Sequence, residues 1–438
     1  MTKLKSFFFA ASALTLVFIT ACSNAAQIPD AGTGGSAALP EAPFVEGGAS
    51  LILSPNKLNI KVKVTTSDGT PVTVEGCTET TLLSGTETVL HAQGTVVILK
   101  GKIIKLNCHN NQLTELNVQG CTSLQVLSCV GNQLTALNVQ GLTALERLAC
   151  WGNQLTELNV QGCTSLQVLS CVGNQLTALN VQGLTALQEL FCNDNKLTAL
   201  NVQGLTALQT LICSSNQLTA LNVQGLTALQ TLWCYNNQLP AFDVRGLTAL
   251  QELYCSGNQL TELNVQGLTA LQTLICSSNQ LTALNAQGCT ALQELRCGGN
   301  QLTERNVQDC TALRWLYCGS NQLTALNVQD CTALRWLYCG SNQLTALNVQ
   351  GLTALQGLYC YNNQLTAQAF TKLFDDLPQI TSSYGGYCVL CTEESGVSEG
   401  NYTDFTDQPD LAAAFNNAKT VKKWKMYKRN GSGNRVEL

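Results

Sequence analysis

LQVLSCVGNQLTALNVQGLTA, residues 124–144, is one copy of a unit that fills the middle of this chain of 438 residues. Cysteine recurs every 21 residues from Cys108 to Cys360, which makes thirteen copies without a slip, and asparagine follows three residues after each of these cysteines. A unit this short cannot bury its leucines alone, so the copies must stack and share one apolar core. The repeat predicts one elongated domain over residues 103–366, although the length alone would suggest about three globular domains.

The pattern within one copy predicts its local structure. Leu127-Ser128-Cys129 alternates with period two, which is typical of a short strand with Leu and Cys facing inward. The chain is expected to turn at Asn132, where backbone groups would satisfy the side-chain amides of the asparagine column. Leu137-Asn138-Val139 indicates a second short extended piece, and little length remains for a helix. We therefore expect a parallel sheet on the concave side of a solenoid and extended or 3₁₀ backbone on the convex side.

This repeat resembles the leucine-rich repeat in a short bacterial form. It is similar to the repeats of internalins that have a cysteine ladder, and to repeat surface proteins of spirochaetes and Bacteroidetes. The resemblance extends over residues 103–366. It implies a leucine-rich-repeat solenoid, parallel β with little helix on the convex side, and a role in adhesion and virulence.

The 22 cysteines would normally suggest a disulfide framework in an exported protein. However, inward side chains on neighbouring parallel strands lie about 4.8 Å apart, which exceeds the roughly 3.8 Å between the β-carbons of a relaxed disulfide. A straight column is also unsuited to a tetrahedral metal site, so we predict buried free thiols, no metal and no cofactor. Five further cysteines occupy a position that is leucine in other copies, which favours packing: Cys121, Cys163, Cys289, Cys310 and Cys331. Cys77, Cys388 and Cys391 are left open, the last two as a local disulfide or two packed thiols.

Aromatic residues indicate a binding surface. Twelve lie between Leu106 and Leu365, and eleven of them occupy the three sites that flank the inward Leu and Cys of the strand. Such sites point away from the core, and exposed aromatic residues beside arginine are typical of binding surfaces. Alternatively, the rings stack into ladders that only stabilise the sheet. The predicted partner-binding residues are Trp151, Phe191, Trp233, Tyr235, Tyr254, Arg296, Trp315, Tyr317, Trp336, Tyr338, Tyr359 and Tyr361.

The N-terminus resembles the signal of bacterial lipoproteins. Two lysines precede an apolar run over residues 6–21, and the run ends in Ile19-Thr20-Ala21-Cys22, which resembles a lipobox. The resemblance implies a signal peptide over residues 1–21 and a membrane anchor of acyl chains on Cys22. Residues 22–49 are rich in Ala, Gly, Pro and Ser and indicate a flexible tether. The alternative is an ordinary signal peptide with a chance cysteine.

Both flanks of the repeats have the features of caps. Residues 50–102 alternate and are rich in Val, Thr and Ile, which predicts an N-terminal β cap with a hairpin turn at Asp68-Gly69. Residues 367–438 predict an α+β C-terminal cap with helices over 367–377 and 410–423. Such caps cover the core and strand edges that an open solenoid exposes.

Composition and motifs exclude several classes of function. The net charge of −5 gives no basic surplus for nucleic acid, and two histidines leave little general-base chemistry. The sequence shows no nucleophile, paired-carboxylate or phosphate-loop motif, so we do not expect an enzyme. Internalins are usually held on Gram-positive walls by a C-terminal sorting signal, whereas the lipobox favours an outer membrane.

We therefore predict an exported, monomeric protein that is lipid-anchored to a bacterial outer membrane and exposed on the surface. Its aromatic concave face would bind a host or bacterial protein or glycan in adhesion. The alternative is a structural lipoprotein on the periplasmic face of the envelope with no external ligand.

Overall fold

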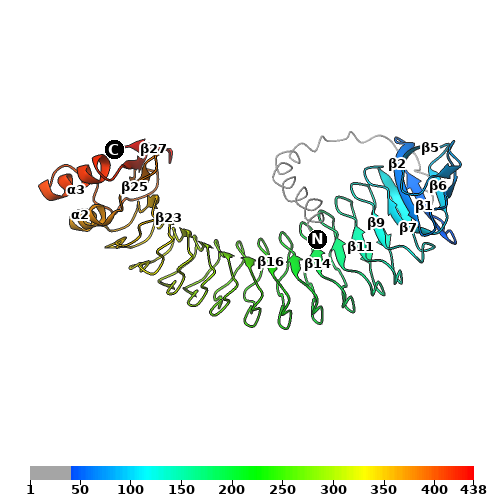
Figure 1. The fold of residues 1–438 in the computed structure, drawn as a ribbon, viewed down its shortest axis with the longest axis horizontal. Coiled ribbons are helices and arrows are strands. Elements are labelled where there is room, and N and C mark those ends of the chain that lie inside the picture. The colour runs from blue at the N-terminus through cyan, green and yellow to red at the C-terminus, as the bar shows by residue number, and fades with distance from the viewer. Residues whose placement is uncertain (1–40) are drawn as a thin grey trace. The chain divides into compact units, whose positions relative to one another are not determined.

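The computed structural model describes residues 41–438, and the predicted signal peptide, Cys22 and most of the predicted tether lie outside the described residues. Residues 41–438 form a leucine-rich-repeat solenoid of parallel strands with a β cap and an α+β cap at its two ends (Figure 1). The predicted fold class is confirmed. Within this range no helix is long and apolar enough to span a bilayer.

One strand from each turn joins a single sheet that runs along the repeats. In-register parallel pairing sets each strand leucine beside that of the next turn, as Leu190 lies beside Leu211. The repeat strands are β7 (Ile103–Asn107), β9 (Val126–Ser128), β11 (Arg147–Ala149), β13 (Val168–Ser170), β14 (Glu189–Phe191), β15 (Thr210–Ile212), β16 (Thr231–Trp233), β17 (Glu252–Tyr254), β18 (Thr273–Ile275), β20 (Glu294–Arg296), β22 (Trp315–Tyr317), β23 (Trp336–Tyr338) and β24 (Gly357–Tyr359). The predicted period-two strands are therefore confirmed in all thirteen units.

The second extended piece of each unit is less regular. It forms strands in five turns: β8 (Leu113–Asn117) of the first repeat pairs with the N-terminal cap, β10 (Ala136–Asn138) pairs with β12 (Glu157–Asn159), and β19 (Ala283–Asn285) pairs with β21 (Glu304–Asn306). The other described turns have extended or bent backbone there, and the described repeats contain neither α- nor 3₁₀-helix. Of the two predicted forms, the extended one is therefore present, because two strand pieces and two turns use up the 21 residues.

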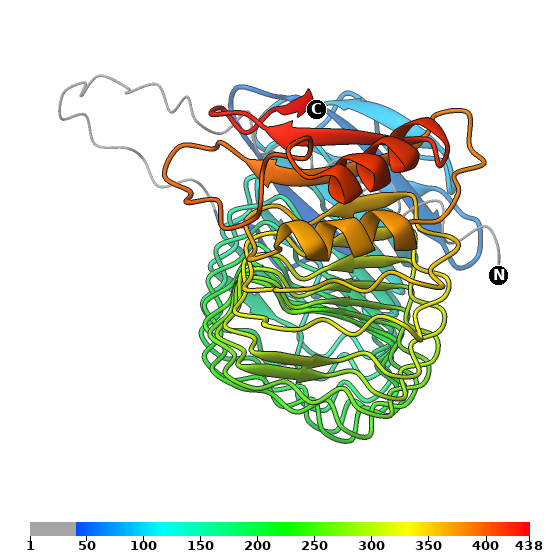
Figure 2. The ribbon, with the colours of Figure 1, turned by 90° about the vertical axis from the view of Figure 1, so that its left-hand side faces the viewer.

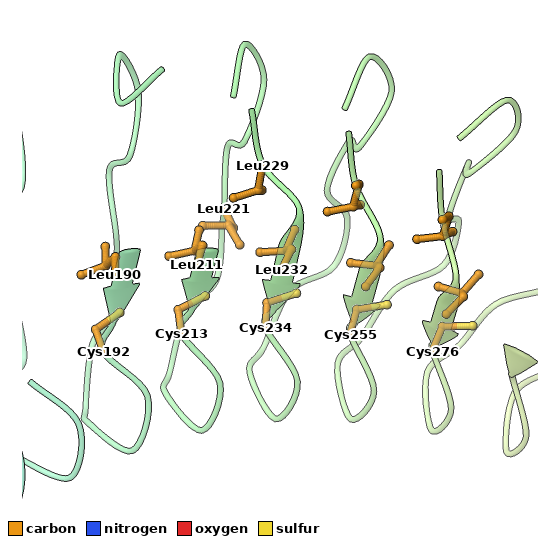
Figure 3. Packing of buried hydrophobic residues seen from close by; sticks show 14 of the residues in the cluster. Leu190, Cys192, Leu211, Cys213, Leu221, Leu229, Leu232, Cys234, Cys255 and Cys276 are labelled. Carbon is orange, nitrogen blue, oxygen red and sulfur yellow. The ribbon is translucent and has the colours of Figure 1, made fainter. Parts of the chain in front are cut away.

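Leucine and cysteine side chains form columns inside the solenoid. Figure 3 shows Leu190 and Leu211 in one column and Cys192 and Cys213 in another, all pointing to the same side of the strands. These side chains are fully buried, and each buried leucine stabilises the fold by about 1.5–3 kcal/mol. All cysteines in the described range are buried thiols, which confirms the prediction and assigns Cys77 and the CxxC pair to the same class.

The asparagine column links each turn to the one before it. The Asn132 Nδ2 atom donates to the carbonyl oxygens of Cys108 at 3.0 Å and Cys129 at 2.8 Å. Its Oδ1 atom accepts from the Leu113 backbone N–H at 3.0 Å. The same three bonds recur through Asn363, so the predicted structural role of the asparagines is confirmed.

The N-terminal cap shares both of its sheets with the first repeat. Strands β5 (Glu87–His91) and β2 (Asn59–Thr66) extend the long sheet, because β2 pairs with β7. The second sheet has the order β4-β3-β6-β1-β8, in which β8 (Leu113–Asn117) comes from the first repeat. Its other strands are β1 (Gly48–Leu53), β3 (Val72–Glu75), β4 (Thr81–Leu82) and β6 (Val96–Lys100).

Two details of this cap differ from the sequence-based expectations. Asp68-Gly69 does form a turn, but the hairpin prediction is wrong, because the turn connects β2 of one sheet to β3 of the other. The cap also begins before the predicted boundary at residue 50. The backbone N–H of Ala42 donates to the Glu115 carboxylate at 2.6 Å, and the side chain of Val45 is buried.

The C-terminal cap continues the repeats with a strand that the sequence analysis missed. Helices α2 (Ala367–Asp376) and α3 (Pro409–Thr420) lie side by side (Figure 2) and confirm the two predicted helices, although α3 ends earlier than expected. Between them, β25 (Gly386–Thr392) pairs in parallel with β24. Strands β26 (Trp424–Arg429) and β27 (Arg435–Glu437) then complete the long sheet.

Asn401 in this cap occupies the next place in the asparagine column. Its Oδ1 atom accepts from the Leu365 backbone N–H at 2.9 Å. Its Nδ2 atom donates to the carbonyl oxygens of Cys360 at 2.9 Å and Leu390 at 2.8 Å. The cap therefore closes the solenoid with the same bonds that join the repeats.

Candidate partner-binding surface

The predicted partner-binding residues lie on the outward face of the long sheet, which we call the strand face. They occupy the two outward sites of each short strand or the position directly after the inward cysteine. Trp151 and Arg296 are exposed, and the other ten side chains are half-buried. The period-two argument therefore placed these side chains on the correct side of the sheet.

Three tyrosines form a stacked row near the C-terminal end of the strand face. The ring centroids of Tyr317 and Tyr338 are 4.3 Å apart, and those of Tyr338 and Tyr359 are 4.1 Å apart. The guanidinium of Arg296 lies 4.7 Å from the Tyr317 ring centroid and closes one end of the row. Register explains the row, because equivalent sites on neighbouring parallel strands lie about 4.8 Å apart. We call these four residues the tyrosine row.

A second row begins at Trp336 and continues into the cap. The ring centroid of Trp336 lies 6.3 Å from that of Tyr387 on β25, and Tyr387 lies 6.1 Å from Tyr427 on β26. Strand β24 lies between Trp336 and Tyr387 and has Gly357 at the facing site. The glycine leaves room for the indole ring, so we call Trp336, Tyr387 and Tyr427 the cap row.

Arg435 on β27 joins the two rows. Its Nη1 atom donates to the Tyr359 hydroxyl at 3.1 Å, and its guanidinium lies 5.7 Å from the ring centroids of both Tyr387 and Tyr427. The ammonium group of Lys425 lies 5.8 Å from the Tyr387 ring centroid. Each distance is within the range of a cation–π interaction.

We call the tyrosine row, the cap row and Arg435 together the C-terminal aromatic group. Most of the remaining predicted residues lie apart from it, and Tyr361 and Trp315 lie beside it. Trp233 and Tyr254 stack at 4.9 Å on β16 and β17 and form a separate pair, and the Trp233 indole N–H donates to Glu252 at 3.2 Å. The other residues on earlier turns are Trp151, Phe191 and Tyr235. Tyr361 lies beside the tyrosine row with Arg429 over its ring at 4.8 Å, and Trp315 pairs in register with Trp336. The structure thus divides the single predicted site into a C-terminal aromatic group and several smaller parts.

Burial raises the pKa of two tyrosines on the strand face, Tyr338 and Tyr254. Burial, and then the neighbouring Tyr359 and Tyr317 hydroxyls, raise the pKa of Tyr338 above its ordinary value of 10.0. Burial is also the main cause of the raised pKa of Tyr254. At neutral pH these hydroxyls therefore remain protonated and can donate hydrogen bonds to a partner.

Two functional candidates were missed from the sequence: Tyr387 and Arg435. Tyr387 had a local signal, because Tyr387-Cys388 repeats the outward-inward alternation of the units. Arg435 had none, because its position depends on β27 folding back on β26. In the described range, no three His, Cys, Asp or Glu side chains are placed to hold a metal ion.

No protein-family model and no curated protein matches this sequence. Solved structures do match the fold. The functional domain of InlJ from Listeria monocytogenes, which includes a cysteine ladder, is 29% identical, with a TM-score of 0.54 over 74% of this chain and 73% of that one. A leucine-rich-repeat protein from Leptospira interrogans is 28% identical, with a TM-score of 0.52 over 62% and 81% of the two chains. The internalin InlF from Listeria monocytogenes is 22% identical, with a TM-score of 0.51 over 71% and 84%.

The shared fold is the leucine-rich-repeat solenoid. These structural neighbours are bacterial leucine-rich-repeat proteins, and their fold indicates a role in protein interaction. Leucine-rich-repeat proteins are generally binding scaffolds without enzymatic activity. The C-terminal aromatic group is the part of the strand face with the composition of such a binding surface.

Proposed function

We propose that the protein binds a macromolecular partner through the C-terminal aromatic group of the strand face. The observation that supports this most directly is the continuous set of half-buried rings and exposed cations formed by the tyrosine row, the cap row and Arg435. A side chain that served only the core would be buried, whereas these side chains stay partly accessible on a rigid sheet. Rigid, partly exposed Tyr, Trp and Arg residues are the usual centre of a protein interface.

The proposed place of action is the outside of a bacterial outer membrane, with Cys22 as the lipid anchor and adhesion as the role. This part of the proposal depends on the lipobox-like Ile19-Thr20-Ala21-Cys22 and on the resemblance of the repeats to those of internalins. Labelling of cells with an alkyne fatty acid should modify the wild-type chain and should leave Cys22→Ser unmodified. A labelled Cys22→Ser chain would contradict the anchor.

Binding is tested with the triple variant Trp315→Ala, Trp336→Ala and Tyr338→Ala. Pull-down with the full chain from host matrix, mucus or neighbouring bacteria should recover a partner that the triple variant loses. Trp151→Ala is the matched control, because it removes an exposed ring from the same sheet far from the cap. A folded triple variant that retains the partner would contradict the site.

The second candidate is an envelope scaffold without an external ligand. Ring stacking within the tyrosine row favours it, because stacked cross-strand pairs stabilise a sheet in the absence of any partner. Protease treatment of intact cells separates the two proposals. Digestion before lysis is expected for the adhesion role, and complete protection until lysis would contradict it.

A further inference from the structure

The guanidinium of Arg435 is held in place without a carboxylate partner. Tyr359 accepts one hydrogen bond from it at 3.1 Å, and the rings of Tyr387 and Tyr427 lie beside it at 5.7 Å. A guanidinium has five N–H donors, so most of its donors stay available, and the side chain is exposed. Three tyrosines thus restrict a cation whose donors can still bind two oxygens of one carboxylate.

Two carboxylates that follow β25 are paired with other cations. Glu393 pairs with Lys428 at 2.7 Å, and Glu394 pairs with Arg429 at 3.0 Å. Within residues 41–438, no carboxylate lies within ion-pair distance of Arg435 or of Lys425. Glu437, which faces Tyr427 from β27, is also outside ion-pair distance of both cations. Among the described residues, Arg435 and Lys425 therefore have positive charges without an ion-pair partner.

The stacking of the rings favours a polypeptide ligand over a sugar ligand. A sugar ring binds to the free face of an aromatic ring, but the tyrosine row stacks face to face at 4.3 and 4.1 Å. The cap row is also stacked, with interplanar angles of 20° and 14°. Ring edges and hydroxyl groups remain for a partner, and aromatic edges have a positive partial charge that adds to the cations.

We infer that Arg435 and Lys425 bind carboxylates of an acidic polypeptide segment that lies across the tyrosine row and the cap row. The inference rests on the proposed function, because it names the class of partner for the same surface. Holding the guanidinium in advance reduces the ordering cost of binding. The pairing would weaken as salt screens the charges.

A random 12-residue peptide library displayed on phage is the probe, selected against the full chain. Peptides selected on the wild-type protein are expected to be enriched in Asp and Glu. Their affinity should fall at least about tenfold in Arg435→Gln with Lys425→Gln, as expected for one lost charge-assisted hydrogen bond. Arg435→Lys keeps the charge without the planar donors and should lose a smaller part of the affinity.

Lys63→Gln with Lys105→Gln is the matched control. It removes two exposed charges from the strand face at the opposite end of the same sheet, and affinity should change less than about twofold. Selected peptides without acidic enrichment, or equal binding to the Arg435 and Lys425 double variant, would overturn the inference. Tighter binding of heparin than of the peptides at the same residues would overturn the polypeptide assignment.

The triple variant at Trp315, Trp336 and Tyr338 separates this inference from the proposed function. If the selected peptides are neutral, and bind the wild type but not the triple variant, the proposed function is supported and the acidic partner is contradicted. Peptides that bind all variants equally would contradict both.

Discussion

The indole ring of Trp336 lies over Gly357 of the next strand, where a β-carbon on the glycine would come within 2.0 Å of the Trp336 Cε3 atom. The ring thereby crosses β24 and reaches Tyr387 on β25, with a centroid distance of 6.3 Å. A side chain at residue 357 would occupy this path. The last repeats and the cap share one aromatic row because this site is glycine.

Gly357→Ala should displace the Trp336 ring and separate it from Tyr387. The backbone of Gly357 lies outside the left-handed region, so the cost comes from overlap, and we expect a loss of about 1–3 kcal/mol in unfolding free energy. Near-ultraviolet circular dichroism should lose intensity from the Trp336–Tyr387 pair. Gly94→Ala is the control, because an added β-carbon there meets nothing within 4 Å. Unchanged spectra and stability in Gly357→Ala would contradict the packing.

Asn258→Ala should weaken the middle of the solenoid. The Asn258 amide donates to the carbonyl oxygens of Cys234 and Cys255 at 3.0 Å and accepts from the Leu239 backbone N–H at 3.1 Å. Removing it leaves buried backbone groups without partners, which costs about 1–3 kcal/mol in urea unfolding. The control is Asn264→Ala, an exposed site with one local bond, where the change should stay within about 0.5 kcal/mol. Equal effects at the two sites would contradict the bridging role.

Asn401→Ala should release the C-terminal cap while the earlier repeats stay folded. Asn401 is the last member of the asparagine column. Its side-chain amide forms hydrogen bonds with backbone groups of Cys360, Leu365 and Leu390. Hydrogen exchange should therefore speed up in residues 367–438 and stay unchanged in the first repeats, since the free energy of local opening varies along a solenoid. Asn416→Ala, at an exposed site on α3, should leave exchange in the cap unchanged. Uniform acceleration along the whole chain would argue against a local role.

The buried thiols should make stability fall at alkaline pH. Burial raises the pKa of Cys129 and Cys171 from 9.0 to about 12 in the folded protein. Below pH 9 the thiols are protonated in both states, so the stabilisation is fully present. Between pH 9 and about 12 they ionise only in the unfolded chain, and each such thiol lowers the unfolding free energy by about 1.4 kcal/mol per pH unit.

Urea unfolding at pH 7, 8.5 and 10 measures this loss. Cys121→Leu with Cys289→Leu is a suitable comparison, because leucine fills the same position in other turns, as at Leu142 and Leu268. The pKa of Cys121 is raised to about 12 and that of Cys289 to about 11. Removing both thiols should therefore make the unfolding free energy fall less steeply with pH above pH 9, by the contribution of two ionising groups. Parallel pH profiles of the two proteins would contradict the assignment.

The sequence by itself determined the solenoid and its interior. Contacts between neighbouring turns recur at fixed separations, 21 residues for paired strand positions and 19 or 24 for the asparagine bonds, so one unit already specifies its neighbours. The inward Leu190 and Cys192, the bridging Asn195 and the outward Phe191 all follow from this translation. The outward position of the predicted binding residues followed from the same alternation.

Only the tertiary structure decided how the repeats end and which aromatic residues gather. Arg435 reaches Tyr359 across 76 residues of chain, and Asn401 completes a column whose spacing of 21 it does not keep. The Asp68-Gly69 turn connects two sheets where local sequence suggested a hairpin. The caps contain no repeat, so their contacts depend on the path of the chain in space, and a translational pattern cannot specify that path.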